Sequence, residues 1–198
     1  MEAEVPLSIF TAFVSAPTGA ARLAKVAEAQ QKYDPRHDYY KPLREAAVRT
    51  LVTHDASHVH QAAERAHQSR QDHYFACATG LEKWITKTAY QVIERPKSVR
   101  WKSGELVINV TPELLLRVGS SSTLVKLYLR QDPLTRDGRN AFSFLVSTTH
   151  RYVAEAEPQL LLLRTAQLQR GHPPRGAEKI VKAEAAMFLS MWRSNKAA

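Results

Sequence analysis

The hydrophobic pattern of this chain changes near residue 90, and that change limits the folds it can adopt. Before residue 90, apolar side chains recur at the three- and four-residue spacing of helices. From residue 98 to residue 130, apolar and often β-branched side chains alternate with polar ones. The first pattern buries one stripe of a helix and the second buries one face of a strand. The sequence therefore predicts an α+β protein, helical in its first half and built around a short β-meander in its second.

Capping and breaking residues give the expected bounds of these elements. Thr18 can cap a helix over residues 19–33, and Pro42 fits the first turn of a helix that ends near Val52. Pro112 cannot donate to a sheet ladder, so we expect it at an edge or a bulge. The other expected elements are a helix from Asp55 or Ser57 to Lys87 with a break near Gly80, strands at 98–102, 105–118, 123–130 and 159–169, a helix from Asp137 or Asn140 to about Ala156, and a helix at 175–194.

The chain reads as one domain over residues 1–198, with a mainly helical part at 1–90 and a βββαβα part at 91–198. Its length suffices for one substantial core and is rather short for two, and no Gly/Ser or Pro linker divides the halves. No apolar run approaches the roughly 20 residues of a membrane-spanning helix. The start is acidic, and Cys77 is the single cysteine, so no intramolecular disulfide forms. These features indicate a cytoplasmic protein without a membrane partner.

The formal charge of +9 at pH 7 points to a polyanionic partner. A positive field attracts polyanions, and nucleic acid is the commonest of them. Phosphate contacts would supply affinity that depends on salt and not on base sequence. The candidate nucleic-acid-binding residues, with Trp101 as a stacking aromatic, are Arg100, Trp101, Lys102, Arg117, Arg130, Arg170 and Arg175. The same pattern also fits an ordinary sheet edge protected by charge.

Two polar side chains of the expected meander fall on one face of the sheet, because alternate residues of a strand share a face. If the hairpin loop has four residues, Val118 pairs with Thr123. Glu113 then lies opposite Tyr128, one diagonal step from Lys126. Diagonal neighbours lie roughly 7–8 Å apart, which long side chains can span. The sequence thus predicts a polar patch that holds a carboxylate and an ammonium group, while the other face is apolar and forms core.

The order of elements and these two residues resemble the PD-(D/E)XK nuclease superfamily. Its core is a helix, a three-strand meander, a helix and a strand, with Pro-acid in the second strand and acid-x-Lys in the third. Here Pro112-Glu113 precedes Leu124-Val125-Lys126. The resemblance covers roughly residues 80–170 and implies N-terminal helices before a βββαβα core, with a restriction-endonuclease-like mixed sheet flanked by helices. In the family, the acids hold a divalent metal and the lysine helps position the attacking water.

Leu124 stands where the family has its second acid, so the implied site is incomplete. The resemblance implies Glu113 and Lys126 as catalytic residues, with Mg²⁺ or Mn²⁺ held by Glu113 and a migrated acid. The candidates for that acid are Glu45, Glu82 and Asp132. With such an acid the chain would be a weak metal-dependent phosphodiesterase. Without one it would be an inactive relative that needs no cofactor and binds DNA or RNA, in nucleic-acid processing or in defence against foreign DNA.

Two other interpretations stay open. Glu113 and Lys126 could form an exposed cross-strand ion pair worth well under ~1 kcal/mol, with nothing catalytic present. The chain could also be a non-enzymatic assembly subunit that holds a protein partner with its helical half. Salt-sensitive binding to nucleic acid would separate the second interpretation from the nuclease-like one.

One cluster of polar side chains and one single carboxylate are further candidates for a partner. His60, Glu64 and His67 lie on one face of a helix and could hold a metal, although the polar residues around them favour a solvated face. Glu184 lies on the apolar side of the last helix. A buried carboxylate must be paired or hydrogen-bonded, so we expect an arginine from a neighbouring element beside Glu184.

Overall fold

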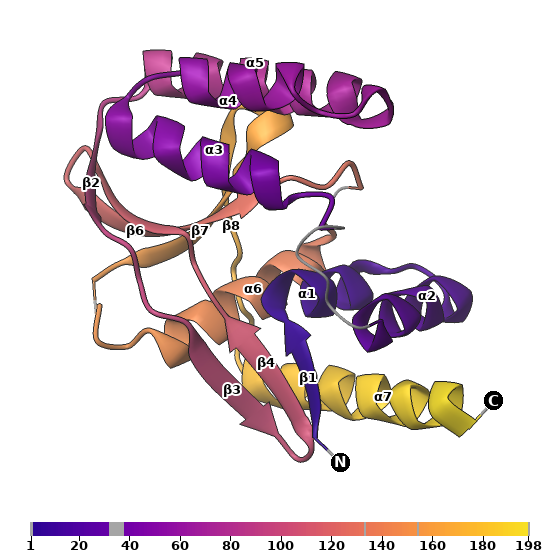
Figure 1. Ribbon diagram of the computed structural model, residues 1–198. Helices are drawn as coiled ribbons and strands as arrows, with labels where there is room; N and C mark the ends of the chain where they lie inside the picture. Colours follow the sequence, from indigo (N-terminus) through magenta and orange to yellow (C-terminus); the bar gives the residue numbers. More distant parts are fainter. Residues whose placement is uncertain (1, 32–37, 133, 154, 198) are drawn as a thin grey trace.

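A computed structural model describes residues 2–31, 38–132, 134–153 and 155–197 (Figure 1). Its elements, in chain order, are β1 (Ala3–Pro6), α1 (Leu7–Ser15), α2 (Gly19–Gln30), α3 (Lys41–Thr53), α4 (Ser57–Glu64), α5 (Gln68–Lys87), β2 (Tyr90–Glu94), β3 (Val99–Ser103), β4 (Leu106–Val110), β5 (Leu114–Val118), β6 (Ser121–Tyr128), α6 (Arg136–Thr149), β7 (Glu157–Leu162), the 3-10 turn η1 (Leu163–Thr165), β8 (Gln167–Arg170) and α7 (Ala177–Ala197). The predicted α+β class, with mixed sheets flanked by helices, is confirmed.

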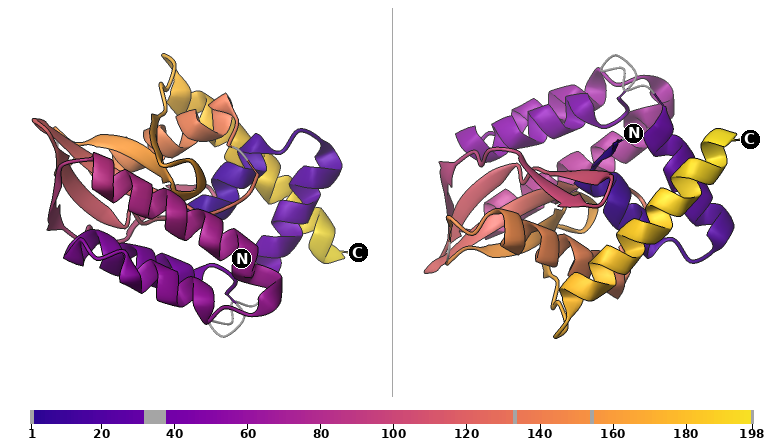
Figure 2. Two further views of the ribbon diagram at one scale, coloured as in Figure 1. Left: turned by 90° about the horizontal axis from the view of Figure 1, so that it is seen from above. Right: turned by 90° about the horizontal axis from the view of Figure 1, so that it is seen from below.

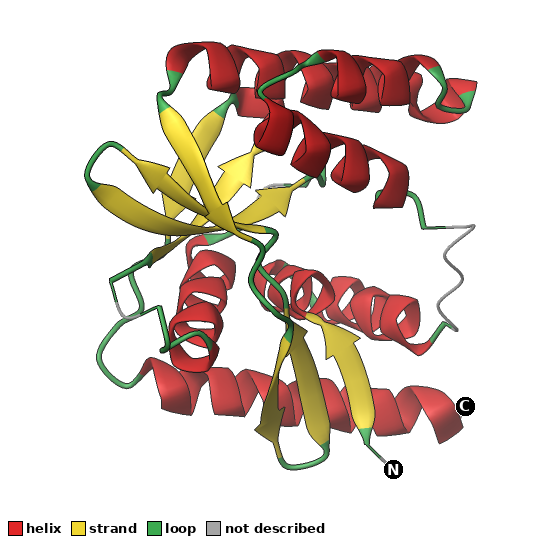
Figure 3. Cartoon of the chain, turned by 60° about the vertical axis from the view of Figure 1, so that its left-hand side comes forward, coloured by secondary structure: helices red, strands yellow, loops and turns green. Residues whose placement is uncertain are grey.

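The strands form two sheets (Figure 3). The larger has the order β2-β5-β6-β7-β8, and its first three strands are an antiparallel meander. Helix α6 then crosses over to bring β7 parallel to β6, and β8 returns antiparallel to β7. The smaller sheet has the order β1-β4-β3, with β1 parallel to β4.

Helices cover both faces of the larger sheet. Helices α3, α4 and α5 lie on one face, whereas α6 lies on the other with α1, α7 and the smaller sheet beyond it (Figures 1 and 2). Leu114, Leu116 and Val125 pack toward α3–α5, as the alternation predicted. Leu115 and Leu124 pack into a second apolar cluster on the opposite face. The face expected to carry the polar patch is therefore mostly core as well.

Pro112 separates two sheets and does not sit inside one strand. The predicted strand at 105–118 is wrong, because β4 ends at Val110 in the smaller sheet and β5 begins at Leu114 in the larger. Because proline has no N–H to donate to a sheet ladder, Pro112 is suited to the segment that connects the two sheets. The strand predicted at 98–102 is present as β3, but it pairs with β4 and not with the meander. Its expected place beside β5 is taken by β2, which the sequence analysis did not predict.

Several predicted bounds also change. The helical stretch expected over 57–87 breaks between α4 and α5 and not near Gly80, which lies inside α5. The strand expected at 159–169 is a hairpin whose turn includes Ala166 at φ 55°. The α6 helix is capped by Thr135, whose Oγ1 accepts from Gly138 N at 3.2 Å, and it ends at Thr149. The first-half helix predicted over 19–33 ends at Gln30, and residues 32 and 33 lie outside the described chain.

Two other local predictions, at Thr18 and at Glu184, are confirmed. Thr18 caps α2, since its hydroxyl accepts from Ala21 N at 3.2 Å. Glu184 meets an arginine, with Arg22 Nη1 3.0 Å from its Oε2. Along the described residues, no helix combines the length and the apolar character that crossing a bilayer requires.

Candidate functional site

The register of the meander brings Glu113 and Lys126 directly opposite one another. Gly119, at φ 59°, opens a two-residue turn, so Val118 pairs with Ser121. Two-residue turns with glycine in the first position are a common hairpin connection. The predicted four-residue loop, with Val118 opposite Thr123, is therefore wrong by two residues. Because side chains alternate with a period of two, the shift changes the partners but leaves every side chain on its predicted face.

Glu113 and Lys126 form a largely buried pair in which the ammonium group and both carboxylate oxygens have hydrogen-bond partners. Lys126 Nζ lies 2.5 Å from Glu113 Oε1 and donates to Thr111 O at 3.0 Å. Glu113 Oε2 accepts from Leu127 N at 2.8 Å. The exposed fractions of the two side chains are 8% for Glu113 and 15% for Lys126, so the ion pair is not the exposed one considered above. Both carboxylate oxygens are thus used by the protein itself.

The pair connects the two sheets. Thr111 directly follows β4 of the smaller sheet, whereas Glu113 directly precedes β5 of the larger one. Glu113 N also donates to Val125 O at 2.9 Å, which extends the ladder between β5 and β6 by one bond. Lys126 reaches from the middle of β6 to this crossing. The pair therefore holds the short segment around Pro112 against the meander.

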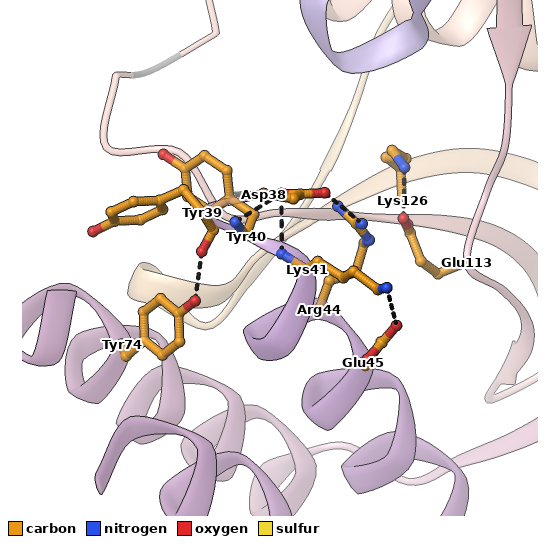
Figure 4. A network of polar contacts seen from close by, with 9 residues as sticks. All are labelled: Asp38, Tyr39, Tyr40, Lys41, Arg44, Glu45, Tyr74, Glu113 and Lys126. Atoms are coloured by element: carbon orange, nitrogen blue, oxygen red, sulfur yellow. Dashed lines mark hydrogen bonds and ion pairs between the residues drawn. The ribbon is translucent and has the colours of Figure 1, made fainter. Parts of the chain in front are cut away.

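The acids proposed to complete a metal site do not join Glu113. Glu45 is exposed on α3 and lies 4.0 Å from Lys41 (Figure 4). Asp132 is exposed beyond β6, and its main-chain oxygen accepts a hydrogen bond from the Tyr128 hydroxyl.

Glu82, the third candidate acid, and Leu124, which stands where the family has its second acid, do not complete a metal site with Glu113 either. Glu82 Oε2 lies 2.9 Å from His60 Nε2 on the helical side. Leu124 is 1% exposed and packs in the core. Among the described residues, no group of three or more His, Cys, Asp or Glu side chains is placed to hold a metal. Since Mg²⁺ is held through carboxylate oxygens, the donor set around Glu113 does not fit a divalent cation.

The polar stripe of β6 continues from Lys126 into a second ion pair. Arg130 Nη2 lies 2.5 Å from Glu28 Oε1 on α2, and Lys25 Nζ lies 3.1 Å from Glu28 Oε2. Burial by itself would raise the pKa of Glu28, but the hydrogen bond and charge of Arg130, together with Lys25, lower that pKa below its usual value. Arg130, predicted to bind nucleic acid, is thus occupied in linking the segment directly after β6 to α2. Burial raises the pKa of the neighbouring Tyr128 to about 12.

The basic residues predicted on the first strand are engaged by the N-terminal strand. Arg100 Nη2 lies 3.3 Å from Glu4 Oε2, and Lys102 Nζ lies 3.0 Å from Glu2 Oε1. Trp101 between them is 9% exposed and belongs to the core, so its ring cannot stack on a base as expected. Alternation along β3 explains the difference, because the side chain between two solvent-facing cations must point inward.

The remaining predicted cations are dispersed. Arg170 Nη1 pairs with Glu157 Oε2 at 2.8 Å. Arg117 on β5 and Arg175 before α7 are exposed, and neither has an ion-pair partner within the described residues. The predicted set therefore does not gather into one patch.

The helical side carries a basic hollow that the sequence did not predict. Two adjoining hollows of about 210 and 380 Å³ lie over α3, α4 and the beginning of α5, and Arg65 lines both. Arg49 lines the first and Arg70 lines the second. The signal was present as arginines and histidines scattered through residues 49–70, but a helical spacing alone gave no way to bring three separate helices together.

The histidines of this region hold no common ligand position. His60 pairs with Glu82 as described above, and His67 Nδ1 accepts from Ser69 N at 3.3 Å at the start of α5.

A scan against models of known protein families finds no match for this sequence, and a search of curated proteins finds no similar sequence.

Proposed function

We propose that this chain binds nucleic acid through its backbone phosphates, on a nuclease-like core in which Glu113 and Lys126 form a structural ion pair. The binding proposal is carried by one observation, the surplus of exposed basic side chains that lack a carboxylate partner. Within the described residues these cations are Arg49, Arg65, Lys83, Lys87, Arg95, Lys97, Arg117, Arg136, Arg151, Arg164, Arg175 and Lys179. Unpaired exposed cations favour association with a polyanion, since they release its counterions on binding.

The order of elements supports the nuclease-like part of the proposal. Helix α5, the meander β2-β5-β6, helix α6 and the parallel strand β7 follow one another in the order that the resemblance implies. Glu113 directly precedes the second meander strand, and Lys126 lies inside the third. Strands β3 and β4 are then an insertion between the first and second strands of the meander.

The contacts of Glu113 favour a structural role over a catalytic one. Its two oxygens are bonded to Lys126 and Leu127, and the acids suggested as helpers face other partners. If a metal did bind, Glu113 would have to release one of these bonds and a second acid would have to move in. We therefore expect binding without metal-dependent cleavage at this pair.

Binding is tested by fluorescence anisotropy with labelled single-stranded DNA, duplex DNA and RNA over a series of salt concentrations. Affinity should fall steeply with salt, with a logarithmic slope of about −0.7 for each single-strand phosphate contact and about −0.9 for each duplex contact. A protein that only holds another protein partner should show no salt-sensitive binding to any of these probes. That result would refute the proposed function.

Cleavage is tested separately by incubating the chain and its Glu113→Gln variant with plasmid, single-stranded DNA and RNA in Mg²⁺ or Mn²⁺. We expect intact substrates from both proteins. Cleavage by the wild type that disappears in a folded Glu113→Gln variant would show that Glu113 is catalytic and would overturn its structural assignment. Equal cleavage by both proteins would exclude Glu113 as its source.

A further inference from the structure

We infer that the basic hollow over α3, α4 and the start of α5 holds consecutive phosphates of a nucleic-acid strand. This inference rests on the proposed function and names the surface that performs it. None of the residues that line the hollow was among the predicted nucleic-acid-binding residues, which lie on β3 and β5, just beyond β6, at the end of β8 and in the loop before α7.

The charge of the hollow is positive and little neutralised. Arg49 and Arg65 are exposed, and neither has an ion-pair partner within the described residues. Among the described residues that line the two hollows, Glu45 is the one carboxylate, and Lys41 lies 4.0 Å from it. His58 lines the first hollow and lies 3.9 Å from Asp55. An anion that enters the hollow thus meets guanidinium groups that are free to bind it.

The arrangement of the cations suits a chain of phosphates better than one anion. Arg49 lines only the first hollow, Arg70 only the second, and Arg65 both. A site for a single anion would converge its donors on one point, whereas these three are spread over two adjoining hollows. Ala46, Ala62 and Ala66 line the hollows between them, and such small side chains let a backbone approach closely.

One wall of the hollow is held in place by a polar network (Figure 4). The Arg70 guanidinium lies 4.7 Å from the centre of the Tyr39 ring, a cation–π contact that orients the group and keeps its charge. Tyr74, which lines the second hollow, donates from its hydroxyl to Tyr39 O at 2.5 Å. Asp38 accepts from Tyr40 N at 2.9 Å, which fixes the same segment from the other side. The position of Arg70 is therefore set before a ligand arrives.

The test is a double charge reversal, Arg49→Glu with Arg65→Glu, in the full chain. Its matched control is Lys182→Glu with Arg193→Glu, two exposed cations of α7 that already have ion-pair partners in Glu178 and Glu105, on a helix that lies away from α3–α5 (Figure 1). Binding to a labelled single-stranded oligonucleotide is measured by anisotropy at several salt concentrations. The hollow variant should lose affinity at least about tenfold, and its salt slope should become shallower by about 1.4, twice the value of roughly 0.7 per contact. The control should change affinity less than threefold.

The outcomes separate the inference from the function on which it rests. Wild-type binding that survives the hollow variant, or falls equally in the control, would overturn the inference and leave nucleic-acid binding standing. An absence of wild-type binding would refute the proposed function itself. In a third comparison, inorganic phosphate and unlabelled oligonucleotide compete with the labelled oligonucleotide at equal phosphate concentration. If inorganic phosphate displaces the probe as well as the oligonucleotide does, the hollow is a site for a single anion, and the inference is wrong. Thermal melting checks the fold, and if charge reversal unfolds the chain, Arg49→Gln with Arg65→Gln carries the same comparison.

Discussion

At the scale of single residues, Lys126 stabilises the fold and contributes little to the molecular surface. Its ammonium group joins the residue after β4, the residue before β5 and the strand β6 in one set of contacts. Moving two charges out of water is costly, and only the mutual attraction and the additional hydrogen bonds compensate for that cost. Removing one partner would leave the other charged, buried and unpaired.

We therefore expect Lys126→Met to lower the free energy of unfolding by roughly 3 kcal/mol. Urea denaturation followed by circular dichroism measures the change. Lys83→Met is the matched control, because Lys83 is exposed on α5 with no ion pair in the described chain, and surface changes of this kind stay within about 0.5 kcal/mol. Equal stability of the two variants would contradict a structural role for Lys126.

Glu28 gives a prediction on the pH dependence of stability. Its pKa is lower in the folded chain than the usual value of 4.5, so the unfolded chain binds a proton first as the pH falls. The stabilisation by Glu28 is then complete above about pH 4.5 and is lost as the pH falls through the lowered pKa.

Glu28→Gln should therefore be less stable than the wild type at pH 7, and the difference should shrink on acidification below pH 4.5. Denaturant unfolding of both proteins at pH 7 and pH 3 measures it. A difference that stays constant between the two pH values would mean that the charge of Glu28 contributes nothing.

At the scale of elements, the contact between α5 and η1 depends on a glycine. A Cβ atom at Gly80 would lie 1.7 Å from Leu163 O, inside the backbone of the neighbouring turn. Gly80 was expected to break a long helix, whereas the residue lies within α5 and permits close packing. The sequence shows that a glycine is present but not which backbone it faces.

Gly80→Ala should accordingly destabilise the chain by about 3 kcal/mol, the upper part of the usual range for overpacking. Gly19→Ala is the control, because nothing lies within 4 Å of its Cβ position and its φ is not positive. Alanine at the start of α2 should be neutral or slightly stabilising. Thermal melting of both variants makes the comparison, and an unchanged melting temperature for Gly80→Ala would exclude the close approach.

Element identity was more predictable than element pairing. The capped helix α2 and the hairpin β5-β6 were recognised from local signals, a threonine before a helix and a glycine between apolar strands. The strands β1 and β2 were missed, since each is short and gains most of its hydrogen bonds from a distant partner. The period of the pattern told which residues share a face but could not tell how many residues form the turn.

At the scale of the whole molecule, the larger sheet is buried on both faces. Leu114 and Leu116 face one apolar cluster, while Leu115 and Leu124 face the other. A central strand that is buried on both faces has a nearly continuous apolar sequence. The apolar packing on both faces explains why an open polar patch does not form at Glu113 and Lys126. The basic hollow lies instead over α3, α4 and the beginning of α5, and we propose that nucleic acid binds there.

The sequence by itself determined the α+β class, which residues of a strand share a face, the cap of α2, the need of Glu184 for a cationic partner and the net positive charge. These properties follow from hydrophobic period, local hydrogen bonding and composition, which act over a few residues or over the whole chain. Only the tertiary structure decided that 105–118 is divided between two sheets, that Glu113 is fully bonded and that three helices bring Arg49, Arg65 and Arg70 to one surface. Such neighbours are separated along the chain, and their meeting depends on how complete elements pack, a property that no local pattern encodes.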